Sequence, residues 1–314
     1  MAKMERLEKL EGVGNVKMVE AEIPSPGNDE VLIKVRRSLI SRGSELFRRY
    51  VMPGAIPPHM MGYSDAGDVI EVGDLVEGVV IGERSNVGGP HAQYVVGPHG
   101  NIPDGLDYEA ATFIGLATSS VMWARTTPIK PGDVVVVLGQ GIVGNLYMQA
   151  VRERLPSKVI TVDANKLRCD ISQQCGADMV VDVSKTDSVE FVMDITDGKG
   201  ADVVVDTTGN ARVIESAYEL THPDGKTILV GVPRKGDNIS IYSLPLHFNK
   251  VLTGSEGGGS IPHVDIPRYI RLHQAGQFNL DGLVTHEFSL DEVNDAIDVV
   301  RSGECGRCMI DMSL

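Results

Sequence analysis

The sequence predicts an α/β protein in which a doubly wound parallel-sheet domain is inserted into a β-rich domain. Short β segments separated by Gly and Pro fill the first third of the chain, and strands alternate with helical runs from Asp133 to about Gly231. A helix and a strand then return at the C-terminal end. Such alternation is typical of a parallel sheet covered on both faces. At 314 residues the chain can form two domains, because single cores stop growing at roughly 250–300 residues.

The β-rich part is recognised from short apolar segments with turn signals between them. The expected strands are Val31–Val35, Asp68–Val72, Val76–Ile81 and Gln93–Val96. Around Asp107 the pattern becomes helical and continues through Arg125. A C-terminal helix is expected from a Ser cap at Ser289, with apolar residues at helical spacing through Ile297. A last strand is expected over Cys308–Met312.

The inserted part is recognised from nearly continuous apolar runs. Its expected strands are Val134–Leu138, Lys158–Val162, Met179–Val181, Asp202–Asp206 and Thr227–Val232. Runs of this kind suit a sheet buried on both faces. We therefore place the nucleotide-binding domain at 119–256 and the β-rich domain at 1–118 and 257–314.

Composition and charge exclude several classes of protein. The net charge of −14 opposes binding to phosphate backbones or anionic membranes. No stretch approaches the roughly 18 apolar residues of a membrane span, and the N-terminus lacks the apolar core of a signal peptide. Four cysteines are too few for a disulfide framework in a chain of this length. We expect a cytoplasmic protein with a small-molecule substrate, and neither nucleic acid nor membrane as a partner.

A glycine-rich turn provides the strongest functional signal. Gly139, Gly141 and Gly144 form a G-x-G-x-x-G motif between an apolar strand and a helical run, which is the context that a Rossmann dinucleotide site requires. Gly139 permits the tight turn, Gly141 lets the backbone approach a diphosphate, and Gly144 lets helix and strand pack closely. The N–H groups at the helix start, from Ile142 and Val143 onward, favour an anion.

The next strand ends at Asp163, which lies 24 positions after Gly139. A carboxylate there can bind ribose hydroxyls and would repel a 2′-phosphate, so the pattern favours NAD over NADP. Lys166 and Arg168 follow closely and leave NADP open, and Arg168 is a cofactor-site candidate. Thr208 follows a later strand, at the carboxyl edge of the sheet where ligands bind.

At this point the chain resembles the medium-chain dehydrogenase/reductase superfamily, which includes zinc alcohol dehydrogenases, polyol dehydrogenases and quinone reductases. The resemblance runs nearly end to end. It depends on the segments Gly62–Gly73, His91–Val96, Lys130–Asp133 and Asp202–Gly209, and on the C-terminal helix–strand pair. It implies a GroES-like catalytic domain with an inserted Rossmann domain. It also implies that Arg42 reaches the cofactor diphosphate, although a surface ion pair with Glu45 is the alternative, and that Gly231 and Val232 lie beside nicotinamide.

The chain departs from the zinc enzymes of this superfamily at every expected ligand. Ser41 matches the first Cys ligand, Tyr63-Ser64 matches the His-Glu pair, and the third ligand falls near Ile114-Gly115. Hydroxyl and aliphatic side chains do not replace thiolate and imidazole on Zn²⁺. The four-Cys structural lobe is also missing. We predict no metal. The CxxC pair Cys305 and Cys308 is interpreted as a turn, because a zinc site needs about four ligands.

With these replacements the chain resembles a zinc-less subgroup of the superfamily. This subgroup includes bacteriochlorophyllide hydroxyethyl dehydrogenase-like proteins and sugar or cyclitol oxidoreductases. We expect Tyr63 to be the principal hydrogen-bond donor or proton carrier to the substrate oxygen, assisted by Ser41, Ser64 and Glu45. The alternative is that Tyr63 only fills the volume of the missing metal site. His91 could approach the cleft, but a lone histidine before a strand is more often structural.

The resulting hypothesis is a zinc-independent, NAD(H)-dependent oxidoreductase that interconverts a secondary alcohol and a ketone on a sugar, cyclitol or larger ring. Two alternatives stay open at this point: a zinc-free enone or quinone reductase, and a non-catalytic NAD-binding protein. Members of the superfamily pair through the sheet edge that matches Val251–Thr253. A homodimer is therefore expected.

Overall fold

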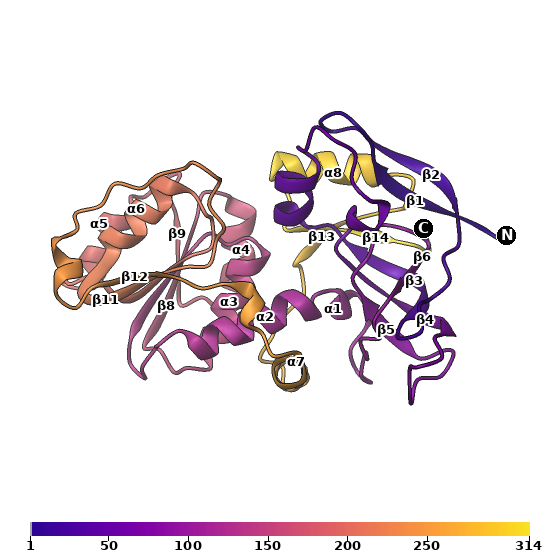
Figure 1. Ribbon diagram of the computed structural model, residues 1–314. Coiled ribbons are helices and arrows are strands. Elements are labelled where there is room, and N and C mark those ends of the chain that lie inside the picture. Colours follow the sequence, from indigo (N-terminus) through magenta and orange to yellow (C-terminus); the bar gives the residue numbers. More distant parts are fainter. Residues whose placement is uncertain (1) are drawn as a thin grey trace. The chain divides into compact units, whose positions relative to one another are not determined.

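The chain folds into two compact units in the computed structural model, which describes residues 2–314 (Figure 1). The first unit comprises Met1–Gly115 and Asp281–Leu314, and the second comprises Leu116–Leu280. Both ends of the chain therefore belong to the first unit. The second unit is inserted into it, as the sequence predicts.

The second unit contains a six-stranded sheet in which every pair of neighbouring strands is parallel. Its strands are β7 (Val134–Leu138), β8 (Lys158–Asp163), β9 (Met179–Asp182), β10 (Ala201–Asp206), β11 (Thr221–Leu229) and β12 (Val251–Gly254). They lie in the order β12-β11-β10-β7-β8-β9. This is the Rossmann order, and it reverses between β7 and β10. Ligands of such sheets bind beyond the carboxyl ends of the strands at that point.

Helices α3 (Ile142–Arg152), α4 (Lys166–Gln174), α5 (Ser188–Ile195) and α6 (Ala211–Leu220) flank this sheet (Figure 1). The remaining helical segments of this part of the chain are α2 (Ile114–Thr126), α7 (Pro262–Gln274) and the short 3₁₀ turns η3 (Leu244–His247) and η4 (Gly257–Gly259). The consecutive valines Val135, Val136 and Val137 are all 0% exposed. A strand buried on both faces explains their continuous apolar run. Asn165 caps α4 by accepting a hydrogen bond from the N–H of Arg168.

The first unit is β-rich and mostly antiparallel. Its strands are β1 (Lys3–Lys9), β2 (Val16–Glu22), β3 (Val31–Leu39), β4 (Ser64–Val72), β5 (Arg84–Val87), β6 (Tyr94–Gly97), β13 (Val284–Phe288) and β14 (Arg307–Asp311). β1 and β2 form a separate hairpin, and the larger sheet has the order β13-β14-β3-β4-β5, with β6 also paired to β3. β3 is thus the central strand. Its end leads directly into the Ser41 segment.

Short helices complete the first unit. They are η1 (Arg42–Arg49), η2 (Pro58–Met60), α1 (Tyr108–Thr112) and α8 (Val293–Ser302). η1 is a π-helix, a form that is rare and frequent at functional sites. Its Leu46 is buried in one apolar core with Ile297 and Val300 of α8. The C-terminal return of the chain therefore packs against the segment that follows Ser41.

Two expectations about local structure were wrong, and one element was missed. Val76–Ile81 forms no strand, because Gly78 has φ +74° and the side chains of Val80 and Ile81 are 61% and 70% exposed, so nothing packs on them. The last helix begins at Val293 rather than beside Ser289, whose hydroxyl instead donates to Glu292. The hairpin β1–β2 was not recognised from its highly charged sequence.

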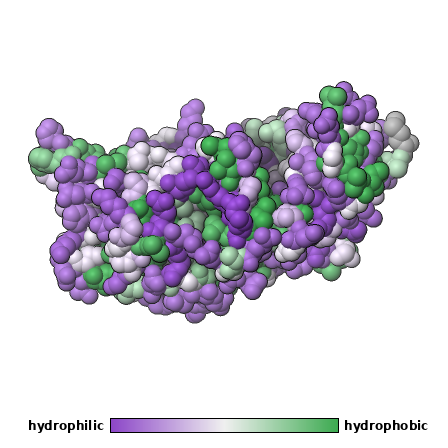
Figure 2. All heavy atoms as spheres, turned by 90° about the horizontal axis from the view of Figure 1, so that it is seen from below, coloured by the Kyte–Doolittle hydropathy of each residue, from purple (hydrophilic) through white to green (hydrophobic). Residues whose placement is uncertain are grey.

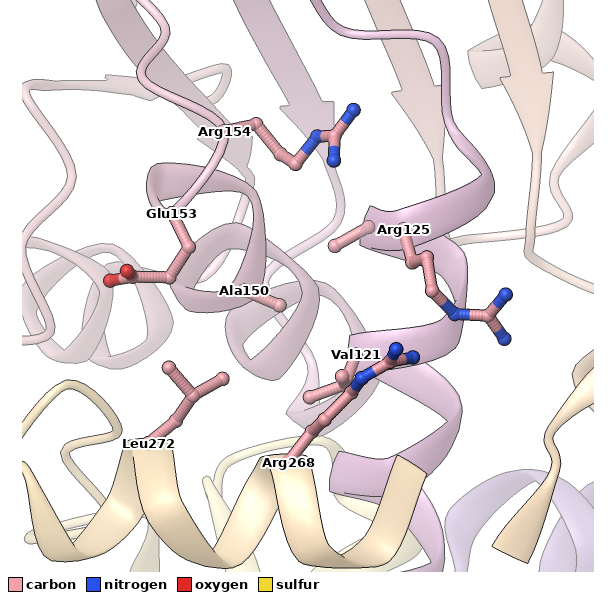
Figure 3. Close-up of a pocket in the computed structure, with 8 residues that line it drawn as sticks. Val121, Arg125, Ala150, Glu153, Arg154, Arg268 and Leu272 are labelled. Carbon is pink, nitrogen blue, oxygen red and sulfur yellow. The ribbon is translucent and has the colours of Figure 1, made fainter. Parts of the chain in front are cut away.

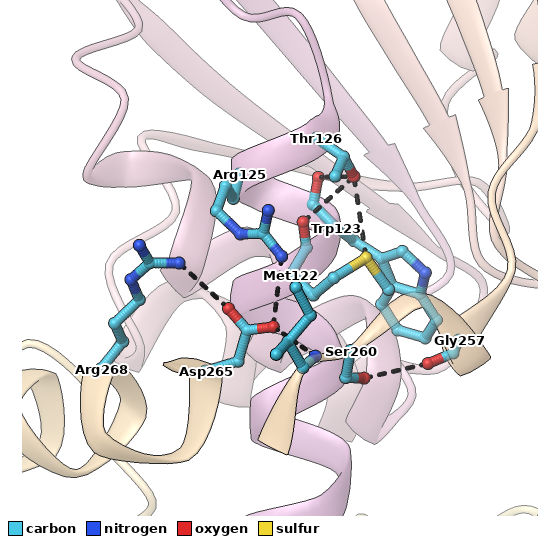
Figure 4. Close-up of polar contacts among 9 residues, drawn as sticks. Met122, Trp123, Arg125, Thr126, Gly257, Ser260, Asp265 and Arg268 are labelled. Carbon is cyan, nitrogen blue, oxygen red and sulfur yellow. Dashed lines mark hydrogen bonds and ion pairs between the residues drawn. The ribbon is translucent and has the colours of Figure 1, made fainter. Parts of the chain in front are cut away.

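The second unit also extends further along the chain than residue 256, where we placed its end. α7 belongs to it because the buried carboxylate of Asp265 binds Arg125 of α2 at 3.2 Å (Figure 4). Arg268 binds the other oxygen of Asp265 at 3.1 Å, and Gln149 of α3 binds the backbone of Asn279. The units divide at 280/281 instead, since a dense set of polar contacts holds residues 262–280 against α2 and α3.

The surface agrees with the charge of the sequence. The face drawn in Figure 2 is mostly hydrophilic, with apolar side chains gathered in smaller groups between polar ones. Among residues 2–314, no helix is long and apolar enough to cross a membrane.

Candidate functional site

The glycine turn of the second unit has the geometry that its sequence predicts. Gly139 has φ +88°, a left-handed conformation that favours glycine. A Cβ on Gly144 would lie 1.8 Å from the carbonyl oxygen of Gly139. The backbone N–H of Gly139 donates to the Val162 carbonyl at 2.8 Å, which ties the turn to β8. The turn and the start of α3 can pack this closely only with glycine at Gly139 and Gly144.

Gly141 is different, because it faces open space. A Cβ there would meet no atom within 4 Å, and as N-cap of α3 Gly141 provides no side-chain hydrogen bond. The first turn of α3, which includes Ile142 and Val143, therefore has no side-chain cap at its N-terminal end. Uncapped N–H groups and the positive end of the helix dipole attract an anion such as a diphosphate. This space fits the cofactor that the motif implies.

Asp163 ends β8 beside this turn. Its carboxylate accepts hydrogen bonds from the backbone N–H of Gln140 at 2.6 Å and of Asn165 at 2.8 Å. The acid is thereby fixed next to the glycine turn. Arg168 lies in the first turn of α4, and Lys166 forms an ion pair with Asp170. Both cations therefore follow Asp163 closely.

The ends of β10 and β11 lie beside the glycine turn. The Thr207 hydroxyl donates to the Gly139 carbonyl at 2.8 Å, so β10 ends against the glycine turn. Thr208 donates its hydroxyl to Asp206 at 2.6 Å. A Cβ on Gly231 would lie 2.2 Å from the backbone nitrogen of Gly209, which brings the two strand ends together. Val232 follows with 89% of its surface exposed, where a ligand could cover it.

In the first unit, Ser41 and Glu45 lie together, and both are buried. Ser41 is the N-cap of η1, and its hydroxyl oxygen accepts from the N–H of Ser44 at 3.2 Å. Its own N–H donates to Glu45 Oε2 at 2.5 Å. The Glu45 side chain is 0% exposed, and its other oxygen is bound to His91. Glu45 therefore positions Ser41 and does not face a ligand.

Tyr63 and Ser64 enter β4 next to this segment. Burial raises the pKa of the Tyr63 phenol, the positive charges of Arg307 and Arg49 lower it, and the Glu45 charge raises it, with a net increase. Tyr63 thus keeps its proton at neutral pH and can donate a hydrogen bond. The Ser64 hydroxyl accepts from the Asn86 amide at 2.9 Å and is nearly buried.

Two buried polar residues next to these, Ser38 and Asp65, were missed from the sequence, and both are 0% exposed. His91, interpreted as more often structural, is also 0% exposed and hydrogen bonds Ser38 and Glu45. The available signal was a polar residue at an inward position of an otherwise apolar strand. Arg42, the last candidate of this unit, was expected at the cofactor diphosphate, with an ion pair to Glu45 as the alternative. Its guanidinium lies over the Phe47 ring at 5.0 Å, and the Glu45 carboxylate is bound to Ser41 and His91 instead.

The donor set at the positions that match zinc ligands does not fit the metal. Ser41, Tyr63 and Ser64 offer hydroxyls, and within the described residues 2–314 no three His, Cys, Asp or Glu side chains are grouped to hold a metal ion. The four cysteines are buried thiols. Cys305 and Cys308 hydrogen bond each other, which together with burial raises the pKa of Cys308.

A groove of about 390 Å³ lies elsewhere in the second unit, between α2, α3 and α7 (Figure 3). Its walls are apolar, from Val121, Ala150 and Leu272, and three arginines reach its rim. Arg125 and Arg268 are held there by Asp265. None of the residues predicted for the cofactor or the substrate lines this groove.

Comparisons with known proteins agree with this geometry. Residues 143–274, inside the second unit, match the family model described as zinc-binding dehydrogenase. The chain is 28% identical to an L-threonine 3-dehydrogenase of Pyrococcus abyssi, over 97% of both chains. It is 25% identical to an S-(hydroxymethyl)glutathione dehydrogenase of Escherichia coli, over 94% of this chain and 96% of the relative. A zinc-binding dehydrogenase of Sinorhizobium meliloti, solved with NADP, shares 25% identity and a TM-score of 0.86 over 99% of this chain and 100% of its own.

Proposed function

We propose that this chain, an alcohol or polyol dehydrogenase-type oxidoreductase of the medium-chain dehydrogenase/reductase superfamily, interconverts a secondary alcohol and a ketone with NAD(H) and without zinc. The observation that carries the proposal is that each unit contains one of two sites. One is the open space at Gly141 beside the uncapped α3, and the other is the hydroxyl set at Ser41 and Tyr63 where relatives of the zinc type have metal ligands.

The choice of NAD is supported by Asp163. Its carboxylate is fixed at the end of β8 by two backbone N–H groups, and a fixed negative charge there would repel a 2′-phosphate. The Sinorhizobium relative bound NADP, and Arg168 lies close by, so the direct comparison of both cofactors belongs to the test. Gly141, Gly144, Ile142 and Val143 would hold the diphosphate.

The chemistry divides between the cofactor and the chain. Nicotinamide supplies or accepts the hydride. The chain must orient the substrate and move one proton. Because the pKa of Tyr63 is raised, the phenol is a neutral donor that can hydrogen bond a carbonyl oxygen and give it a proton during ketone reduction. Ser41 and Ser64 would support the same oxygen, and Glu45 would act only through Ser41.

The experiment begins with fluorescence titration of the wild-type chain with NADH and NADPH. Absorbance assays follow with 2,3-butanediol, L-threonine, benzyl alcohol, myo-inositol and cyclohexenone. The proposal predicts tighter NADH than NADPH binding and turnover of a secondary alcohol that persists in the presence of a chelator. Loss of turnover with the chelator refutes zinc independence, turnover of cyclohexenone alone indicates an enone reductase, and binding without turnover indicates a non-catalytic protein.

Tyr63→Phe tests the proton donor, and Tyr94→Phe is its matched control, because Tyr94 lies in β6 of the same unit. Tyr63→Phe should lower kcat for ketone reduction by about 100-fold, the lower part of the range for acid–base groups, and leave NADH affinity unchanged. Equal activity of the two variants would mean that Tyr63 only fills volume.

We also propose a homodimer that pairs through β12. This strand is at one edge of the sheet, next to exposed apolar side chains at Tyr242, Leu244 and Phe248. An unpaired edge strand readily adds another strand. The opposite edge, β9, is followed by the ion pair of Asp182 with Lys185, which suits an edge that faces water.

A further inference from the structure

Four polar side chains are sealed inside the first unit next to Ser41. Ser38, Glu45, Asp65 and His91 are each 0% exposed, and we name them the imidazole–carboxylate cluster. His91 is at its centre, with Nε2 2.9 Å from Glu45 Oε1 and Nδ1 2.7 Å from the Ser38 hydroxyl oxygen. Asp65 stands opposite Ser38 in the β3–β4 register. Residues from β3, η1, β4 and the segment before β6 thus meet at one imidazole.

The cluster contains two carboxyl groups, those of Glu45 and Asp65, and one imidazole, that of His91. Burial lowers the pKa of His91, but the charge and hydrogen bond of Glu45 and the charge of Asp65 raise it further, against the effect of Arg49, so the net pKa is raised. Burial raises the pKa of Asp65 to about 7, with Glu45 acting in the same sense and His91 and Ser38 in the opposite sense. The cluster can therefore gain or lose a proton near neutral pH, although its side chains have no contact with solvent.

The cluster is connected on both sides to the segments that carry Ser41 and Tyr63. Glu45 Oε2 accepts the Ser41 N–H, and the N–H of His91 donates to the Met61 carbonyl at 3.0 Å. Arg49 donates to the Gly62 carbonyl at 2.6 Å, immediately before Tyr63. The charged groups near Tyr63 are Glu45 and Arg49 of η1 and Arg307 of β14. Of these, Glu45 shares its carboxylate with an imidazole that can titrate.

We propose that the protonation of His91 sets the net charge beside Tyr63 and Ser41, so that the imidazole–carboxylate cluster tunes the proton donor of the reaction without touching substrate or cofactor. The cluster gives no proton to the substrate. When His91 is protonated, its positive charge compensates the negative charge of the Glu45 carboxylate. When His91 is neutral, Glu45 is an uncompensated negative charge that holds the Tyr63 proton more tightly. His91, Asp65 and Ser38 are positioning residues, and the role rests on the function proposed above.

Stability alone does not explain the cluster. A buried ion pair contributes little compared with apolar side chains of the same volume, because removing two charges from water costs about as much as their attraction returns. The surrounding core of this unit is apolar, with Val69, Val87 and Val95 buried beside β3 and β4. A site that retains two buried carboxyls and an imidazole there is better explained by control of charge.

The first test needs no substrate. The pH titrations of His91 (¹⁵N-imidazole) and Tyr63 (¹³Cζ-phenol) are followed by NMR, with resonances assigned from His91→Gln and Tyr63→Phe. The proposal predicts one shared midpoint for both resonances. Asp65→Asn removes a charge that raises the His91 pKa, so both midpoints should move to lower pH together. His286→Gln, at an exposed histidine of β13 in the same unit, should change neither.

Three results would overturn the proposal: a Tyr63 resonance that does not change while His91 titrates, different midpoints for the two, or an Asp65→Asn variant that moves His91 and not Tyr63. The kinetic arm uses the ketone found in the substrate screen. The rate of its reduction should fall by roughly three- to tenfold as the pH rises through the His91 midpoint. A tenfold change in rate corresponds to about 1.4 kcal/mol. If no compound turns over but the resonances share a midpoint, the proposed function fails and the electrostatic coupling stands. Turnover with uncoupled resonances refutes the coupling alone.

Discussion

Replacing Asp65 by Asn should remove much of the pH dependence of the first unit's stability. The ordinary pKa of this carboxyl is 3.8, and burial raises it to about 7 in the folded chain. Each pKa unit corresponds to about 1.4 kcal/mol, so ionising the buried carboxyl costs at most about 4 kcal/mol. The folded state holds this proton more tightly than the unfolded chain does. The protonated Asp65 carboxyl therefore contributes its full stabilisation below the pKa of the unfolded chain. This stabilisation is lost as the pH rises through the pKa of the folded chain.

The measurement is urea unfolding of the wild type and Asp65→Asn at several pH values between about 4 and 8, followed by far-UV circular dichroism. The free energy of unfolding of the wild type should fall by up to about 4 kcal/mol as the pH rises over this range, and that of the variant should fall much less. His91, whose pKa is also raised, acts in the same direction, so some pH dependence should remain in the variant. Trp123, the single tryptophan, lies in α2. Its fluorescence follows the second unit and should change equally in both proteins.

An equal pH dependence in wild type and variant would refute the reasoning. It would mean that water or a rearranged side chain solvates the Asp65 carboxylate, so that burial costs little. A variant whose Trp123 transition also shifts would mean that the substitution acts on the whole chain rather than on the first unit.

Other predictions concern the cofactor and the dimer. Gly141→Ala should keep the melting temperature and weaken NADH binding by about tenfold or more, because the added methyl fills the space of the diphosphate, whereas Gly144→Ala should lower the melting temperature, because its Cβ meets the Gly139 carbonyl. Equal melting temperatures in both would contradict this. Asp163→Ser should raise the ratio of NADPH to NADH affinity by about tenfold by removing the charge that opposes a 2′-phosphate, and an unchanged ratio would show that Asp163 does not read the ribose. Thr253→Lys on β12 should give monomers in light scattering, while Val183→Lys beside β9 should not; two dimeric variants would place the interface elsewhere.

The parts of the molecule that could be predicted from the sequence are those determined by near neighbours. The turn at Gly139 and Gly144 is fixed by two steric facts inside one strand–turn–helix segment, so the motif alone specifies it. The valines of β7 likewise specify a strand buried on both faces. The parallel sheet and the insertion of one unit into the other followed from these local patterns.

The cluster around His91 could not be predicted in this way, because its members are 7 to 53 positions apart in the chain and meet only through the sheet. Glu45 illustrates the difficulty. Its sequence position predicted a reactive acid near the substrate, whereas its burial and its bonds to Ser41 and His91 place it inside the core. The end of the second unit was missed for the same reason, since only the contact of Asp265 with Arg125 assigns α7 to it.

The proposed cofactor site and the proposed proton donor are built from different kinds of group. The cofactor site at Gly141 and the start of α3 is formed by backbone, so few side chains other than Asp163 and Arg168 could alter it. The proposed donor, Tyr63, instead lies next to a cluster whose side chains come from four separate segments, in which a single replacement would change the charge. Ser41 and Tyr63 offer hydroxyl donors at positions where the resemblance places metal ligands. We therefore expect differences in substrate and pH response between related chains to be concentrated in the first unit.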